Sequence, residues 1–169
     1  DLRDMLKANA AGGYPYTPAA GLIAGLAEAV AMLEEEGLDA VHARHARLAE
    51  GVRRAVAAWG MRPCAMSPDL YSPTVTAVVV PPGCNGTDLV KLAAEKYDMA
   101  FGVGLGEVAG KVFRIGHLGM LTDAMVLSGL AVAEMAMADL GWGVKLGSGV
   151  AAAQEFYRGS AGAALRAVA

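Results

Sequence analysis

The run from Thr74 to Val80 constrains the fold of this chain more than any other feature of its sequence. It reads TVTAVVV, so almost every residue is β-branched, and such side chains favour the extended backbone of a strand. Pro81-Pro82-Gly83 follows directly and ends the run, because proline lacks the N–H that a central strand donates. The pattern predicts a β-strand and therefore excludes an all-helical fold.

Apolar residues recur at helical spacing on both sides of that strand. Leu22, Leu26 and Val30 share one side of a helix expected to begin no earlier than Pro18 and to end at Gly37, and we expect that side to belong to a core. The further elements expected along the chain are a helix at 38–59, short extended runs from 61, helices at 88–96 and 122–140, and strands at 97–103 and 111–117. This order predicts an α+β fold with an antiparallel or mixed sheet and helices on one face.

The last part of the sequence is rich in glycine and alanine. Gly147-Ser148-Gly149 is typical of a linker, and a short helix is expected to follow it at 151–157. Residues 159–169 are expected to form a fraying tail.

Charge and composition exclude several classes of protein. The 14 basic and 17 acidic residues are dispersed over 169 positions, so no cationic stripe suited to nucleic acid is present. Acidic residues interrupt the most apolar stretches, at 18–33 and 124–140, which fall short of the roughly 20 apolar residues that a membrane helix needs. We therefore expect neither a nucleic-acid partner nor a membrane span. No signal peptide is visible either, and we expect a cytoplasmic protein. The start at Asp1 rather than methionine indicates a piece of a longer polypeptide.

Three local patterns resemble functional motifs without meeting their requirements. Gly104-Leu105-Gly106 has the spacing of a dinucleotide-binding loop, but a strand follows it where a helix is required, so a β-hairpin connection is expected. His42 and His45 lie three residues apart among arginines, which favours a solvated helix face over a metal site. Cys64 and Cys84 lack metal-site spacing, and no metal is expected.

Arg114 is the residue that most clearly indicates chemistry. It lies inside the apolar run Val112–Gly116, where a buried guanidinium requires an anionic partner. Two interpretations remain open. The guanidinium could hold the carboxylate of an amino-acid or keto-acid substrate through two parallel hydrogen bonds, or it could form an internal salt bridge.

A second candidate is the hydroxyl cluster of Tyr14, Tyr16 and Thr17. Their segment contains Pro15 and Pro18 and lies directly before a helix, so it is stiff and extended. It could present hydroxyls to a phosphate group, or it could serve as a rigid loop that caps the helix.

Three segments together carry a resemblance to a known family. Residues 13–18 (GYPYTP), 72–78 (SPTVTAV) and 110–119 (GKVFRIGHLG) resemble serine–glyoxylate and alanine–glyoxylate aminotransferases, which are fold-type-I enzymes that use pyridoxal 5'-phosphate. The match runs from about residue 10 to residue 158 and implies the C-terminal portion of such an enzyme. The resemblance implies that Arg114 binds the substrate carboxylate. It also implies that Tyr14 and Thr17, with Tyr16 as the alternative tyrosine, reach the cofactor phosphate of a neighbouring subunit in a homodimer.

The resemblance further implies how the chain is divided and what it lacks. Residues 1–37 would end a large domain with an arm and a helix, 38–60 would form an interdomain helix, and 61–158 would form the small C-terminal domain. The lysine that carries the cofactor would lie upstream, so no catalytic residue is expected in this chain. The implied reaction moves an amino group from serine or alanine to glyoxylate. Aspartate-type aminotransferases and desulfurases are rivals within the fold, and a regulatory α+β module that binds amino acids is the alternative from another class.

Overall fold

The computed structural model describes residues 1–165, and these fall into two compact units. The first unit is residues 1–38, and the second begins at Asp39. No helix of the described residues has the length and apolar character needed to cross a bilayer.

The first unit contains the helices α1 (Leu2–Ala10) and α2 (Ala20–Glu36). The helix α1 was not expected from the sequence pattern. It begins where the Asp1 carboxylate accepts a hydrogen bond from the Arg3 backbone N–H at 2.6 Å. The helix at α2 is confirmed, but the prediction that its apolar side belongs to a core is wrong for this chain. None of its residues is buried, and Leu22 is 78% exposed. Helical spacing identifies the apolar side of a helix, and whether other residues cover that side depends on the rest of the protein.

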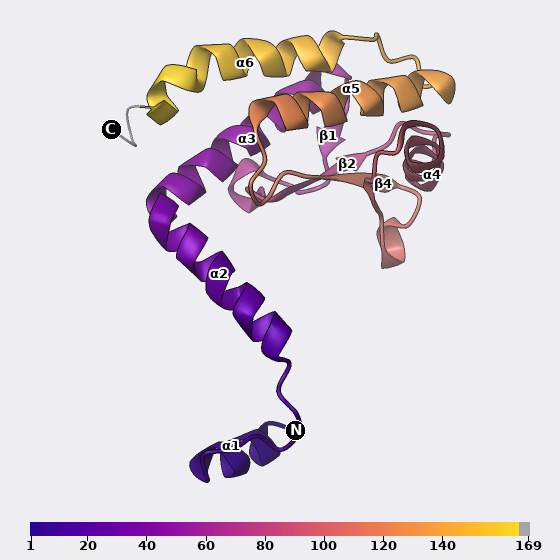
Figure 1. Ribbon diagram of the computed structural model, residues 1–169. Coiled ribbons are helices and arrows are strands. Elements are labelled where there is room, and N and C mark those ends of the chain that lie inside the picture. The colour runs from indigo at the N-terminus through magenta and orange to yellow at the C-terminus, as the bar shows by residue number, and fades with distance from the viewer. Residues whose placement is uncertain (166–169) are drawn as a thin grey trace. The chain divides into compact units, whose positions relative to one another are not determined.

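The second unit is a four-stranded sheet with helices, drawn in Figure 1. Its elements are, in order, α3 (Leu38–Ala58), β1 (Arg62–Pro63), β2 (Val75–Val79), α4 (Gly86–Tyr97), β3 (Gly102–Val103), β4 (Val112–Gly116), α5 (Asp123–Asp139) and α6 (Ser148–Leu165). The strands are ordered β1-β2-β4-β3, and every neighbouring pair is antiparallel. The expected α+β fold is confirmed.

The core lies on one face of the sheet. Val78 of β2 pairs with Phe113 of β4, and both side chains are fully buried among residues of α3, α4 and α5. Leu48 and Leu130 are the largest apolar contributions of α3 and α5. Burial of side chains of this size stabilises a fold by about 1.5–3 kcal/mol each, so this helix-covered face supplies most of the hydrophobic stabilisation of the unit.

Two expectations about element bounds are wrong. Residues 97–101 do not extend β3, because α4 continues to Tyr97 and Asp98 then adopts the left-handed conformation at its end (φ 52°). Residues 148–165 form one long helix, although a linker and a short helix were expected there. The predicted tail overlaps α6 up to Leu165, and its positions 166–169 lie outside the described residues.

A buried carboxylate explains why α6 begins at Ser148. Glu134 of α5 accepts hydrogen bonds from the backbone N–H groups of Gly147 (2.5 Å), Gly149 (2.7 Å) and Val150 (3.2 Å), and from the indole N–H of Trp59 (2.8 Å). These backbone donors at the start of a helix have no partner within the helix itself. Glu134 therefore turns a glycine-rich stretch that is typical of a linker into a helix N-terminus.

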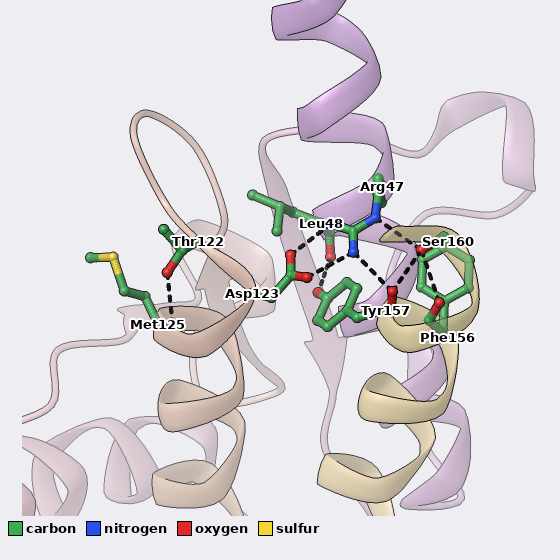
Figure 2. Close-up of polar contacts among 8 residues, drawn as sticks. All are labelled: Arg47, Leu48, Thr122, Asp123, Met125, Phe156, Tyr157 and Ser160. Atoms are coloured by element: carbon green, nitrogen blue, oxygen red, sulfur yellow. Dashed lines mark hydrogen bonds and ion pairs between the residues drawn. The ribbon is translucent and has the colours of Figure 1, made fainter. Parts of the chain in front are cut away.

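A second polar cluster joins α3, α5 and α6, as Figure 2 shows. The Arg47 guanidinium forms two hydrogen bonds with the Asp123 carboxylate at 2.6 and 2.7 Å, and its other donors reach the Ser160 hydroxyl and the Tyr157 carbonyl. The Tyr157 hydroxyl in turn donates to the Leu48 carbonyl at 2.8 Å. One arginine of α3 thus connects this helix with α5 and α6, whose contacting residues lie 76 or more positions further along the chain.

Candidate functional site

Arg114 occupies the middle of β4, between β2 and β3. Its register partners are Ala77 on one side and Gly102 on the other. Phe113 and Ile115 on either side of it are buried in the core, and side chains alternate along a strand. Arg114 therefore projects from the opposite face of the sheet, and it is half-buried there.

The Arg114 guanidinium is held from one side only. Its Nε donates a hydrogen bond to the backbone carbonyl of Val103 at 3.0 Å. In the part of the chain that the structure describes, the side chain forms no ion pair and neither Nη atom donates a hydrogen bond. The internal salt bridge considered from the sequence is thus absent from residues 1–165. The two Nη groups remain available as the planar fork that a carboxylate fits.

The neighbours of Arg114 in the sheet are small. A Cβ atom placed on Gly102 would lie 2.9 Å from Nε of Arg114 and 3.1 Å from its Cβ. A hollow of about 190 Å³ is bordered by Ala77 and by Arg53, Tyr71 and Ser72, and Arg114 is not among its lining residues. The absent side chain of Gly102 lets the Arg114 side chain lie close against β3.

His117 fixes the chain just beyond β4. It is fully buried, and Nδ1 contacts the Pro73 carbonyl at 3.0 Å while Nε2 contacts the Thr76 hydroxyl at 2.8 Å. A carbonyl oxygen only accepts, so Nδ1 carries the proton, and the neutral ring accepts at Nε2 from Thr76. Burial lowers the pKa of His117 from 6.5 to about 4, with the hydrogen bond to Pro73 opposing this shift, so the ring is neutral near pH 7. His117 therefore has a structural role.

His45 has a similar structural role, which corrects the sequence interpretation of it. A solvated position was expected, but His45 is buried, and its Nδ1 contacts the Val41 carbonyl at 2.7 Å. Its Nε2 accepts a hydrogen bond from the Gly119 backbone N–H at 3.0 Å. The ring thus ties the segment after β4 to α3. No group of three or more potential metal ligands occurs among the described residues.

The glycine-rich segment before β4 is a hairpin connection, as expected. It joins β3 and β4, which pair antiparallel, and no long helix follows it. A Cβ on Gly104 would lie 2.2 Å from the Val108 carbonyl oxygen, so this glycine is required by a close backbone approach.

Tyr14, Tyr16 and Thr17 belong to the first unit, in the extended segment between α1 and α2. All three are exposed, and no hydrogen bond involves their hydroxyls within the described residues. The N-cap of α2 is Ala19, with no side-chain hydrogen bond, so the alternative in which these hydroxyls cap the helix is excluded. Exposed, unengaged hydroxyls fit the requirement of donors for a phosphate group.

Sequence reasoning missed the contribution of β3 to this site. The Val103 carbonyl and the space left by Gly102 act on a residue 11 or 12 positions further along the chain. A glycine inside a strand pattern was the available signal, because it often marks a close approach of neighbouring atoms.

Comparison with known proteins identifies close relatives over nearly the whole chain. The L-aspartate–glyoxylate aminotransferase of Paracoccus denitrificans is 60% identical over 164 residues, which are 97% of this chain and 41% of that protein. The serine–glyoxylate aminotransferase of Hyphomicrobium methylovorum is 52% identical over 92% of this chain and 38% of its own length. The pyridoxamine–pyruvate aminotransferase structure from Mesorhizobium loti superimposes with a TM-score of 0.81 at 35% identity, covering 87% of this chain and 38% of that one.

This chain spans about two fifths of the length of the curated relatives that it matches. No protein-family model matches it.

Proposed function

This chain belongs to the serine–glyoxylate and alanine–glyoxylate aminotransferase family of pyridoxal-phosphate enzymes, as a C-terminal portion, and from that premise we propose the reaction of the whole protein. The complete enzyme transfers an amino group from serine, or from alanine, to glyoxylate, giving glycine and hydroxypyruvate or pyruvate. Glyoxylate is named as a substrate of the Paracoccus and Hyphomicrobium relatives, which supports it as the acceptor. The donor of the Paracoccus relative is aspartate, so aspartate belongs in any comparison of donors.

The observation that carries this proposal is the guanidinium of Arg114. It stands on the open face of the sheet with Nε bound to Val103 and both Nη groups available. A carboxylate accepts two parallel hydrogen bonds from such a fork, and all the proposed amino and keto acids carry one. Arg114 therefore binds each substrate by the group that the reaction leaves unchanged, and it orients the reacting carbon.

The cofactor proposal depends on the hydroxyls of the first unit. We propose that Tyr14 and Thr17 donate hydrogen bonds to the phosphate of pyridoxal phosphate in a neighbouring subunit of a homodimer. Their exposure and lack of internal partners among the described residues support this role. Bound pyridoxal phosphate supplies the carbonyl group that accepts the amino group from the donor and passes it to the acceptor.

The organisation of the complete enzyme is part of the same proposal. Residues 1–37 complete a large domain and its arm, 38–60 form the interdomain helix, and 61–158 form the small domain that presents Arg114. The cofactor-bearing lysine belongs to the rest of the polypeptide, so this chain by itself is inactive. A cytoplasmic location is proposed too, supported by the free thiols of Cys64 and Cys84.

Replacing Arg114 with alanine in the complete enzyme tests the proposal. Loss of a charged partner from a substrate carboxylate weakens kcat/KM by about 2–5 kcal/mol, or roughly 30-fold to a few thousand-fold. Arg114→Lys keeps the charge but loses the fork, so we expect an intermediate loss. The absorbance of the bound cofactor should be unchanged in both variants.

Lys111→Ala is the matched control, because Lys111 is an exposed cation next to the same strand. It should leave kcat/KM at the wild-type value. If Arg114→Ala also left kcat/KM unchanged with serine, alanine and aspartate, Arg114 would not be the carboxylate site.

The regulatory interpretation is not favoured, because the relatives described above are aminotransferases that match nearly the full length of this chain.

A further inference from the structure

We propose that the β3 dipeptide Gly102-Val103 is a positioning device for Arg114, which sets the direction in which its fork points. This inference rests on the proposed role of Arg114 in binding the substrate carboxylate. Neither β3 residue touches the substrate, and both act through the guanidinium.

The first part of the device is the carbonyl of Val103. It accepts the hydrogen bond from Nε at 3.0 Å. Nε is bonded to both Cδ and Cζ, whereas the two Nη atoms are terminal. Fixing Nε leaves only the two Nη atoms at the outer edge of the plane, and these are the pair that can hold both oxygens of a carboxylate. The bond to Val103 therefore selects the bidentate edge for the ligand.

The second part is the missing side chain of Gly102. Gly102 and Arg114 are register partners, and a Cβ at Gly102 would lie 2.9 Å from Nε and 3.3 Å from Cζ of Arg114. Both distances are shorter than the roughly 3.5 Å of an ordinary contact, so the guanidinium would have to move away from β3. That movement would break the bond to Val103.

The backbone gives no separate reason for a glycine at this position. The glycines of this chain with a positive φ do not include Gly102, so alanine could adopt its backbone conformation. What alanine would meet is the side chain of Arg114. The effect of a substitution should therefore depend on which side chain stands at position 114.

Gly102→Ala in the complete, cofactor-loaded enzyme tests this dependence, with Gly116→Ala as the matched control. Gly116 is two residues from Arg114 on the same face of β4, and a Cβ there would meet only Leu118, at 3.9 Å. The probe is 3-hydroxypropionate, a carboxylate that has no amino group to transfer, with its Kd measured by calorimetry. The thermal midpoint of each variant is recorded alongside.

We expect Gly102→Ala to raise the Kd of 3-hydroxypropionate about tenfold, equivalent to one hydrogen bond of the pair, with little change in thermal midpoint. Gly116→Ala should bind as wild type does. In an Arg114→Lys background, adding Gly102→Ala should change the Kd no further, because the slimmer ammonium side chain has no Nε bond to lose.

Three results would overturn the proposal. The first is an unchanged Kd in Gly102→Ala, and the second is an equal effect of Gly102→Ala on the Kd in the Arg114→Lys background. The third is a drop in thermal midpoint, or failure to fold, in both backgrounds, which would give Gly102 a packing role.

A failure of the proposed function of Arg114 would give a different result. If wild type does not bind the probe, or Arg114→Ala binds it as tightly as wild type, Arg114 itself is not the carboxylate site.

Discussion

At the scale of single residues, His117 has the clearest pH-dependent consequence. Its pKa of about 4 in the folded protein lies below the ordinary value of 6.5, because burial disfavours the charged ring. The folded state is therefore more stable with the His117 ring neutral than with the ring protonated. This stabilisation is complete above pH 6.5 and is lost as the pH falls from 6.5 towards 4, and the full loss is about 3 kcal/mol at roughly 1.4 kcal/mol per pKa unit.

Hydrogen exchange of the segment 112–119 can measure this loss. We expect the free energy of local opening to fall between pH 7 and pH 5 in the wild type, because protonation of His117 requires the ring to leave Pro73 and Thr76. His117→Gln keeps a donor and an acceptor but does not titrate, so the variant should show a flat profile after correction for intrinsic exchange. Parallel profiles of the two proteins would show that His117 does not carry the pH dependence.

The sequence predicted Arg114 as a candidate site but not its surroundings. A cation within an apolar strand requires a partner, and this rule needs no knowledge of tertiary structure. The contact between Arg114 and Val103 depends on the hairpin register, which the sequence pattern left undefined. The burial of His45 was missed for the same reason, because its partner is the Gly119 N–H, 74 residues away.

At the scale of elements, the helix-covered layer depends on Arg47. Its side chain is 15% exposed and its partner Asp123 is 38% exposed, so water screens the pair only partly.

Helical spacing predicted α3 and α5, and the β-branched run predicted β2, because these are local patterns. The start of α6 was not predicted, because it depends on Glu134 of another helix.

Asp123→Asn tests how strongly Arg47 holds the helices together. Removing the charge leaves the guanidinium with weaker acceptors, and we expect a loss of about 1–3 kcal/mol, below the value for a fully buried pair. Hydrogen exchange of α6 peptides (148–165) should become faster. Asp139→Asn is the control, because Asp139 pairs with the exposed Lys96, and its loss should leave α6 exchange unchanged. Equal exchange in wild type and Asp123→Asn would remove this pair from the stabilising contacts.

At the scale of the whole molecule, the proposed dimer combines residues of two chains in one site. Arg114 would serve the cofactor of its own subunit, and Thr17 would serve that of its neighbour. A dimer mixed from Arg114→Ala and Thr17→Val chains would then have one doubly impaired site and one intact site. Sharing of this kind makes the two substitutions complementary.

Mixing the two impaired variants should therefore restore activity. After subunit exchange, about half of the dimers are mixed and each has one intact site, so we expect about a quarter of wild-type activity. Each variant exchanged with itself is the control and should remain impaired. No recovery in mixtures shown to contain the mixed dimer would mean that Thr17 does not act across the subunit boundary.

The alternation of side chains along β4 has one consequence for altering this protein. Phe113 and Ile115 meet the helices, whereas Arg114 and Gly116 point away from them. Substitutions at 113 and 115 therefore act on different properties from substitutions at 114 and 116. Protein engineering, or natural divergence among relatives with different amino donors, can vary position 114 and its neighbours on β2 and β3 without repacking the interior.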